Sequence, residues 1–364
     1  MEKKFWKPSV TTQFKNCPVP FHMDTYRGCI YDCKYCFARD LTVFARRNSE
    51  NKEFSYLIGN RPDLFKKWMD RTIKSPLNHK KAHEVAFKER MPLKIGATAD
   101  PFPPNEVNEK ITYDILKHLH EIDYPVQMST KNPGVLAKYA GDFDSPNWTV
   151  NVTLTSTDEK FSKIIEPNAP SPIRRFADIK TLTNMGIKVI LRIQPFIYPA
   201  SMGDIDALLY CAKQAGCWGF MTEGLKLRIA MPKPEQELIQ QIGDYLNIDL
   251  RDYYKQENNR TGGDYELSDE HKKEFLNLFE ETAQRYNLKF LNGDNIKYKV
   301  GSGCECCGTE VLRNYKILGC DNKSKLHGVS NEKISKELQK CEVNFTRSQK
   351  YLGKTIGDVC NEMD

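Results

Sequence analysis

The chain has 364 residues, of which 40% are hydrophobic and 28% are charged, and its formal net charge is +6. This length and composition are typical of a globular protein with one large domain or two modest ones, and such a chain buries a sizeable core without disulfides. No run of about 18 apolar residues occurs, and the N-terminus lacks the apolar segment of a secretory signal, which excludes a conventional transmembrane helix. We therefore expect a cytoplasmic protein with no membrane partner.

Between residues 92 and 222, segments typical of strands alternate with segments typical of helices. The predicted strands are short apolar or alternating runs at 92–97, 125–130, 148–154, 187–193 and 218–222. The predicted helices between them lie at 111–122, 133–140, 171–185 and 203–215. Helices that cross between parallel strands produce this rhythm, so the sequence predicts an α/β fold with a parallel sheet. Six or so such units would form part of a (βα) barrel.

The sequence changes character on both sides of this region. Residues 1–28 form an N-terminal extension rich in aromatic and turn residues, and residues 40–90 are polar, basic and predicted to be helical. We therefore expect a core domain at 1–235 that includes this extension and the basic helical insertion. A mostly helical C-terminal module is expected at 236–364, and it contains a Cys-rich loop at 301–320.

Positive charge is unevenly distributed along the chain. It is concentrated in residues 39–94 and again near the C-terminal end. A basic segment is compatible with an anionic partner such as nucleic acid, although charged runs more often form a solvated surface. Nucleic acid is therefore one candidate partner.

The twelve cysteines are clustered rather than evenly spread. One group consists of Cys29, Cys33 and Cys36, and a second consists of Cys304, Cys306, Cys307 and Cys320. In a reducing compartment, clustered cysteines bind metal or take part in redox chemistry more often than they form disulfides. Both groups are therefore candidate functional sites.

The first group has the spacing Cys-x3-Cys-x2-Cys, from Cys29 to Cys36. Three thiolates on one short loop can bind three irons of a [4Fe–4S] cubane, whereas ferredoxin sites close the fourth position with a further cysteine. An iron without a protein ligand could bind the amino and carboxylate groups of S-adenosylmethionine (SAM). The alternative is a zinc site, but zinc normally takes four ligands from paired motifs, and no downstream Cys or His pair has the usual spacing.

The residues around these cysteines resemble the core motif of radical SAM enzymes, most closely the spore photolyase-like branch. The resemblance covers roughly residues 15–230 and rests on segments 17–21, 26–39, 96–106, 129–131, 166–175 and 192–195. It implies a partial (βα)6 TIM-like barrel with a [4Fe–4S] cluster on Cys29, Cys33 and Cys36. It also implies SAM as a second cofactor and an electron donor such as flavodoxin or ferredoxin as a partner.

The resemblance further implies SAM-binding roles for residues near the strand ends, where a barrel places its active site. These residues are Phe37, Thr98, Asp100, Ser129, Lys131, Thr153 and Arg192. Thr98 and Asp100 would hold the SAM amino group, and Thr153 would contact the ribose hydroxyls. Arg192 would pair with the SAM carboxylate through its bidentate fork, and the backbone of Phe37 would reach the adenine.

Simpler structural roles remain possible for some of these residues. Thr153 lies in an alternating strand and can serve only as a β-former, and Phe37 can serve only to pack the loop. Arg192 lies inside an apolar run, where an unpaired guanidinium would be costly, so a functional or paired role is favoured for it.

The second cysteine group permits three interpretations. Cys304, Cys306 and Cys307 could bind an auxiliary iron–sulfur cluster, or one of them could donate a hydrogen atom to a substrate radical. They could also be ordinary cysteines or ligands of a structural zinc, with Cys320 as a further ligand. In spore photolyases the quenching cysteine lies just after the third strand, and the corresponding stretch here, residues 129–132, has no cysteine. The resemblance therefore does not extend to that step.

The leading hypothesis is a radical SAM enzyme that cleaves SAM reductively and abstracts a hydrogen atom from a nucleic acid or nucleotide. Such a reaction would belong to DNA repair, as in a lyase, or to nucleic-acid modification. One alternative is a radical SAM enzyme that modifies a peptide or protein and carries an auxiliary cluster. Another alternative is a non-catalytic iron–sulfur or zinc protein that binds nucleic acid.

Overall fold

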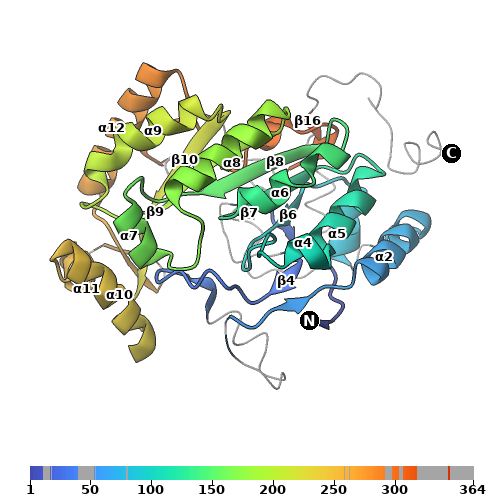
Figure 1. Ribbon diagram of the computed structural model, residues 1–364, viewed down its shortest axis with the longest axis horizontal. Helices are drawn as coiled ribbons and strands as arrows, with labels where there is room; N and C mark the ends of the chain where they lie inside the picture. Colours follow the sequence, from blue (N-terminus) through green and yellow to red (C-terminus); the bar gives the residue numbers. More distant parts are fainter. Residues whose placement is uncertain are drawn as a thin grey trace.

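An open eight-stranded sheet lies at the centre of the computed structural model (Figure 1). The structure describes residues 1–10, 17, 19–39, 53, 55–78, 81–257, 259–261, 263–291, 297–302, 306–317 and 343–344. Across the sheet, the strands are β14 (Lys289–Phe290), β10 (Gly219–Gly224), β9 (Lys188–Phe196), β8 (Trp148–Thr153), β7 (Val126–Thr130), β6 (Leu93–Ile95), β3 (Phe21–Met23) and β2 (Ser9–Val10). All neighbours are parallel except β2 and β3. Within the described residues the sheet does not close.

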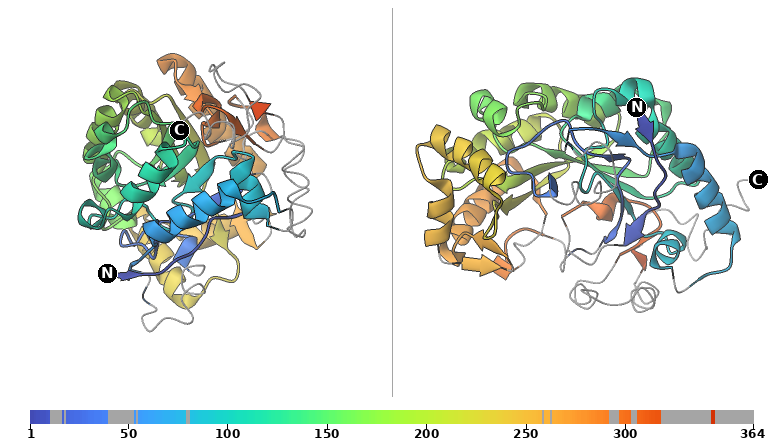
Figure 2. Two further views of the ribbon diagram at one scale, coloured as in Figure 1. Left: turned by 90° about the vertical axis from the view of Figure 1, so that its right-hand side faces the viewer. Right: turned by 90° about the horizontal axis from the view of Figure 1, so that it is seen from below.

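The crossover helices lie on one face of this sheet (Figures 1 and 2). They are α5 (Ile111–His120), α6 (Pro133–Ala137), α7 (Glu159–Ile165), α8 (Pro172–Asn184), α9 (Ile205–Gln214) and α12 (Asp269–Tyr286). The C-terminal segment 306–317 lies on the opposite face, where the side chains of Thr149 and Asn151 hydrogen-bond to its backbone. The sheet is therefore covered differently on its two faces.

Further elements surround the central sheet. The remaining α-helices are α2 (Pro62–Lys74), α3 (Ala82–Lys88), α4 (Glu106–Glu109), α10 (Lys233–Leu246) and α11 (Leu250–Gln256). Small sheets are formed by β1 (Glu2–Lys3), β5 (Ile58–Gly59) and β4 (Tyr26–Arg27), by β11 (Leu227–Arg228), β13 (Asp264–Glu266) and β12 (Asn259–Thr261), and by β15 (Tyr315–Lys316) and β16 (Val343–Asn344). None of the helices in the described part of the chain combines the length and apolar character needed to cross a bilayer.

The central strands carry polar side chains on the face that the helices do not cover. Side chains alternate between the two faces of a strand, so Gln127 and Ser129 share one face of β7, and Thr149 and Asn151 share the same face of β8. Gln127 lies opposite Thr149 and Ser129 lies opposite Asn151, and all four are buried. Their apolar neighbours in the strands pack against the helices. The face opposite the helices is called the inner face below.

The α/β fold expected from the sequence is confirmed, with strands and helices close to the predicted positions between residues 92 and 222. Three strands of the sheet were not predicted, and β2, an edge strand of two residues, is one of them. The other two extend the parallel part of the sheet. One is β3, which has three residues, and the other is β14, which has two residues and pairs with β10. The chain beyond residue 235 therefore contributes to the central sheet, in addition to supplying helices α10, α11 and α12. The division into domains at residue 235 stays a prediction.

Aromatic packing fixes β14 to the sheet. The rings of Phe220 and Phe290 are stacked with their centroids 4.5 Å apart, and Phe279 of α12 lies against both. Phe220 and Phe279 are fully buried, and Phe290 is nearly so. Burial of aromatic rings contributes strongly to core stability, so this cluster joins the C-terminal part of the chain to the sheet.

We expect Phe290→Ala to lower the free energy of unfolding by about 3–5 kcal/mol, because it removes a buried ring and leaves a cavity. Met185→Ala is the matched control, since Met185 is 46% exposed and its truncation should change stability by less than about 0.5 kcal/mol. Urea unfolding followed by circular dichroism measures both. Equal stability of the two variants would contradict the packing of β14 against the sheet.

Candidate functional site

The first cysteine group lies on the loop that follows β4. Gly28 begins this loop with φ +90°, a conformation that favours glycine. The backbone N–H of Lys34 donates to the carbonyl oxygen of Ile165 at the end of α7, at 2.9 Å. The hydroxyl of Tyr31 donates to the carbonyl oxygen of Phe102, at 2.7 Å. The loop is therefore held against the ends of two different βα units.

The loop keeps its three thiols largely away from water. Cys33 is buried, and Cys29 and Cys36 are half-buried. The backbone N–H of Cys36 donates to the carbonyl oxygen of Cys33 at 3.2 Å, which closes a turn between them. Burial raises the pKa of all three thiols, that of Cys29 to about 12, and the nearby Asp100 carboxylate adds to the effect at Cys29.

Among the described residues, no three His, Cys, Asp or Glu side chains converge on a point where one metal ion would bind. Three thiols that bind three different irons of a cubane stand farther apart than three ligands of one ion. A structural zinc would need four convergent ligands.

Asp100 organises the end of β7. Its carboxylate accepts hydrogen bonds from the Thr130 hydroxyl at 2.7 Å, from the backbone N–H of Lys131 at 2.7 Å and from the backbone N–H of Phe102 at 3.0 Å. Burial raises the pKa of this carboxyl, and the three donors oppose the rise. With three donors already bound, Asp100 positions its neighbours.

Thr98 is held by a residue that the sequence analysis missed. Its hydroxyl and its backbone N–H both donate to the carboxylate of Asp24, which also accepts from the backbone N–H of Ala97 at 2.7 Å. Asp24 directly follows β3, the strand that was not predicted. Because β3 and β6 are parallel neighbours, Asp24 and Thr98 meet at the same edge of the sheet.

Close approach of β6 and β7 near this edge requires a glycine. Gly96 has φ +89°, and a Cβ atom there would lie 2.3 Å from the carbonyl oxygen of Ser129. Ser129 itself is 9% exposed, and its hydroxyl accepts a hydrogen bond from Gln127 at 3.1 Å. Any larger side chain at position 96 would push these strands apart.

A buried ion pair joins the cysteine loop to the sheet. The Arg175 guanidinium lies 2.5 Å from the Glu166 carboxylate, and both side chains are fully buried. Arg175 also donates to the carbonyl oxygen of Thr153 at 2.9 Å. Glu166 accepts from the Tyr35 hydroxyl, and the ammonium of Lys131 lies 3.9 Å away. Burial alone would raise the pKa of Glu166, but the charges of Arg175 and Lys131 hold it below its usual range.

Thr153 and Arg192 lie side by side on the inner face. The two residues are partners in the register of β8 and β9, so their side chains point the same way. Thr153 is buried and Arg192 is half-buried. Beyond Thr153, the hydroxyl of Thr155 is buried and has no hydrogen-bond partner among the residues that the structure describes. Phe37 differs from these residues, because its side chain is 60% exposed.

The second cysteine group lies on the inner face as far as it is described. The carbonyl oxygen of Cys307 accepts from the Thr149 hydroxyl at 3.1 Å, and that of Cys306 accepts from the Asn151 amide at 3.4 Å. The predictions for Cys304 and Cys320 lie outside the described residues.

The predicted site residues thus fall into local groups. Asp100 meets Lys131, Thr153 meets Arg192, and the loop of Cys29, Cys33 and Cys36 is tied to both strand ends. Asp24 and the Glu166–Arg175 pair were not predicted from the sequence, although segment 166–175 was among those that carried the resemblance. The sequence signal that could have found the pair was the presence of an acidic residue, Glu166, and a basic residue, Arg175, in that segment.

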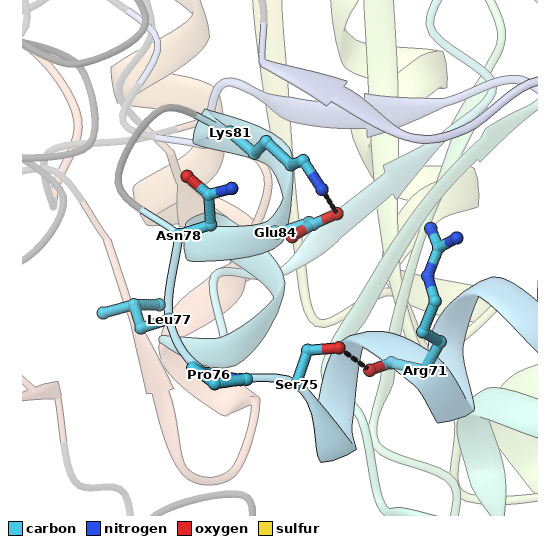
Figure 3. A pocket seen from close by; sticks show the side chains of 7 residues that line it. All are labelled: Arg71, Ser75, Pro76, Leu77, Asn78, Lys81 and Glu84. Atoms are coloured by element: carbon cyan, nitrogen blue, oxygen red, sulfur yellow. Dashed lines mark hydrogen bonds and ion pairs between the residues drawn. The ribbon is translucent and has the colours of Figure 1, made fainter.

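A hollow lies between α2 and α3 (Figure 3). Its volume is about 670 Å³, and it is lined by Arg71, Ser75, Pro76, Leu77, Asn78, Lys81 and Glu84. Lys81 is paired with Glu84 at 2.9 Å. None of the predicted site residues contributes to it.

No protein-family model matches the sequence. An uncharacterized protein of Methanocaldococcus jannaschii is 29% identical over 179 residues, which covers 48% of this chain and 60% of that protein. An uncharacterized protein of Mycobacterium tuberculosis is 23% identical over 216 residues, which covers 58% of this chain and 60% of that protein. The match therefore spans about 60% of the length of each relative.

Two solved structures share the fold. A variant of spore photoproduct lyase superimposes with a TM-score of 0.54 at 15% identity and covers 78% of each chain. Another variant, with bound AdoMet and dinucleoside spore photoproduct, superimposes with a TM-score of 0.52 at 16% identity, over 76% of this chain and 77% of that one. The resemblance to the spore photolyase-like branch is thus confirmed at the level of the fold.

We expect Glu166→Gln to lower the free energy of unfolding at pH 7 by about 3–5 kcal/mol, because it leaves the buried Arg175 charge uncompensated. The control is Asp206→Asn, which breaks the exposed pair with Arg285 and should cost less than about 1 kcal/mol. Denaturant unfolding measures both.

The difference in unfolding free energy between wild type and Glu166→Gln should depend on pH. Because the pKa of Glu166 is lowered in the folded protein, its stabilising effect is present above the unfolded-state pKa of about 4.3 and is lost as the pH falls below it. The stability difference between wild type and Glu166→Gln should therefore narrow in acid. An unchanged difference would contradict an ionised Glu166.

Proposed function

We propose that this chain, which has the fold of spore photoproduct lyase, is a radical SAM enzyme. The observation that carries the proposal is the loop of Cys29, Cys33 and Cys36, which is tied to the strand ends of a parallel sheet by a buried ion pair. A [4Fe–4S] cluster bound there would supply the electron that cleaves SAM to methionine and a 5′-deoxyadenosyl radical. Hydrogen abstraction from a substrate would follow. In this proposal the open sheet is the partial (βα)6 barrel of the family.

Thr153 and Arg192 would bind one side of SAM. Their side chains are neighbours on the inner face, so a guanidinium and a hydroxyl are available together. The guanidinium fork matches a carboxylate and the hydroxyl matches a ribose hydroxyl, as the resemblance implies. Thr155 has a buried hydroxyl without a partner, and SAM could satisfy it.

The remaining predicted residues would act mainly through the backbone or through positioning. Asp100 and Asp24 hold the ends of β7 and β6, and the groups that they orient, including Thr98 and Lys131, would frame the SAM amino group. Ser129 would shape the same edge. The backbone of Phe37, next to the last cysteine, would contact the adenine while its side chain stays exposed.

A nucleic acid or nucleotide is the proposed substrate, in a repair or modification reaction. Solved structures of spore photoproduct lyase contain dinucleoside spore photoproduct. These structures support a nucleic-acid substrate only through the fold that this chain shares with them. The net charge of +6 favours an anionic partner. The inner face also offers buried polar groups, including the Asn151 carboxamide oxygen, which has no hydrogen-bond partner. An external protein such as flavodoxin or ferredoxin would supply electrons.

The hydrogen atom that ends the reaction would come from a position different from that in spore photolyases. Residues 129–132, at the end of β7, contain no cysteine, whereas Cys306 is half-buried on the inner face. Cys306 and Cys307 are therefore the proposed hydrogen donors among the described residues. An auxiliary cluster on this group would also need Cys304 or Cys320, which lie outside the described residues. A peptide substrate has no specific observation in its favour.

We expect the anaerobically reconstituted, dithionite-reduced protein to bind about four irons per chain and to convert SAM to 5′-deoxyadenosine. Cys33→Ala should abolish this product, because it removes one cluster ligand. Cys211→Ala, which removes a half-buried cysteine of α9, should leave the rate unchanged. Product is measured by chromatography, and its absence from the wild type would refute the proposed function.

We expect Arg192→Met to raise the Kd for SAM by roughly 10- to 100-fold, because it removes a charged hydrogen-bond donor from the carboxylate. Arg192→Lys should give an intermediate affinity, since the charge remains but the bidentate fork is lost. Lys188→Met, at the exposed start of the same strand, is the control. Equilibrium dialysis measures all three, and equal affinity of Arg192→Met and wild type would exclude Arg192 from the SAM site.

A further inference from the structure

Two cysteines and a lysine come together at one place on the inner face. Lys94 lies on β6, and its ammonium is 3.9 Å from the sulfur of Cys307. The sulfurs of Cys306 and Cys307 are 3.8 Å apart. Burial alone would lower the pKa of Lys94, but the charges of Cys307, Cys17 and Cys306 raise it. Residues far apart in the sequence therefore form one thiol–ammonium cluster.

The Cys306–Cys307 pair is fixed in this position by the sheet. Thr149 and Asn151, two residues apart on β8, donate to the carbonyl oxygens of Cys307 and Cys306, respectively. Their side chains are fully buried. A segment bound through consecutive carbonyls cannot rotate freely, so the two sulfurs stay close together.

The two thiols differ in exposure. Cys307 is fully buried, whereas Cys306 is half-buried and packs beside the apolar side chains of Ile190, Met221 and Leu291. Cys306 is therefore the more accessible residue of the pair, and an external reagent would meet it first. This is the arrangement of an attacking thiol with a resolving thiol behind it.

The lysine favours thiol chemistry over metal binding. An ammonium beside the Cys307 sulfur stabilises the thiolate, which is the nucleophile in disulfide exchange. The same positive charge would repel a metal cation.

A disulfide between adjacent residues would be easy to reduce. Consecutive Cα atoms are about 3.8 Å apart, whereas most disulfides span Cα separations of about 4.4–6.8 Å. The resulting strain makes the bond labile, and labile disulfides are typical of catalytic or regulatory sites. A bond at this site would thus form and break reversibly.

We propose that Cys306 and Cys307 form a reversible dithiol–disulfide site that reacts with small-molecule disulfides of the glutathione type, with Lys94 as the positioning residue. The Cys306 thiolate attacks the small disulfide, forms a mixed disulfide and releases one thiolate. The Cys307 thiolate then attacks the Cys306 sulfur and expels the second thiolate. Two protein thiols are oxidised to one disulfide, and the small disulfide is reduced to two thiols that take up the two protons.

The test treats the full-length protein with glutathione disulfide, blocks remaining thiols by alkylation and maps the peptides by mass spectrometry. Cleavage after Glu305 separates Cys304 from the pair. We expect the peptide with Cys306 and Cys307 to lose two hydrogens and to regain them with a reductant. Cys211, half-buried on α9, is the internal control and should form only a mixed disulfide.

Variants separate the two steps. Cys307→Ser should stop at the mixed disulfide on Cys306, and Cys306→Ser should leave the buried Cys307 unmodified. Lys94→Met should slow the second step by about tenfold, the effect of one pKa unit on the thiolate fraction, so that the mixed disulfide accumulates. Lys94→Arg should restore the wild-type pattern. Thermal unfolding of each variant checks that the fold is retained.

Three results would overturn the proposal. The first is a pair that stays reduced while Cys211 reacts. The second is a disulfide from either residue of the pair to Cys17 or Cys304. The third is tightly bound iron or zinc that is lost in Cys306→Ser but not in Cys33→Ala. The assay needs neither SAM nor a reduced cluster, so its result is independent of whether the proposed radical SAM activity is found.

Discussion

The buried pair between Glu166 and Arg175 connects the parts of the candidate site. Arg175 comes from α8 and reaches the backbone of Thr153 at the end of β8. Glu166 follows α7 and contacts Tyr35 of the cysteine loop and the ammonium of Lys131. Both charges are fully buried, and each would be costly without the other. Because neither buried charge can be left unpaired, the pair holds the cysteine loop and the ends of β7 and β8 in one fixed arrangement.

Such a buried pair fixes the positions of neighbouring groups more than it stabilises the fold. The desolvation of two buried charges offsets most of their attraction, so an apolar replacement of similar shape could fold equally well. What an apolar pair could not supply is the set of directed contacts to Tyr35, Lys131 and the Thr153 carbonyl. The pair therefore supports a loop whose three thiols have to stay in register with the strand ends.

The two faces of the sheet have different roles, since one packs the core and the other carries the polar residues of the candidate site. Apolar side chains pack against the helices, whereas polar side chains line the inner face from β6 to β9. The segment with Cys306 and Cys307 crosses the same face and is bound there by Thr149 and Asn151. Any substrate that reaches Thr153 and Arg192 would therefore lie near these two cysteines.

Periodicity and spacing predicted the strand–helix order between residues 92 and 222 and the cysteine loop, because those signals are local. They missed β2, β3 and β14, which have two, three and two residues and are too short to show alternation. Asp24 was missed with β3. The contact between Lys94 and Cys307 spans 213 positions and depends on tertiary packing, which no local pattern records.

The most direct test of the central claim is electron paramagnetic resonance of the reconstituted, reduced protein with and without SAM. The account predicts the signal of one reduced [4Fe–4S] cluster, a change in that signal when SAM is added, and no signal in Cys33→Ala. A wild-type protein that assembles no cluster, or a cluster whose signal does not change when SAM is added, would contradict the proposal of a radical SAM enzyme.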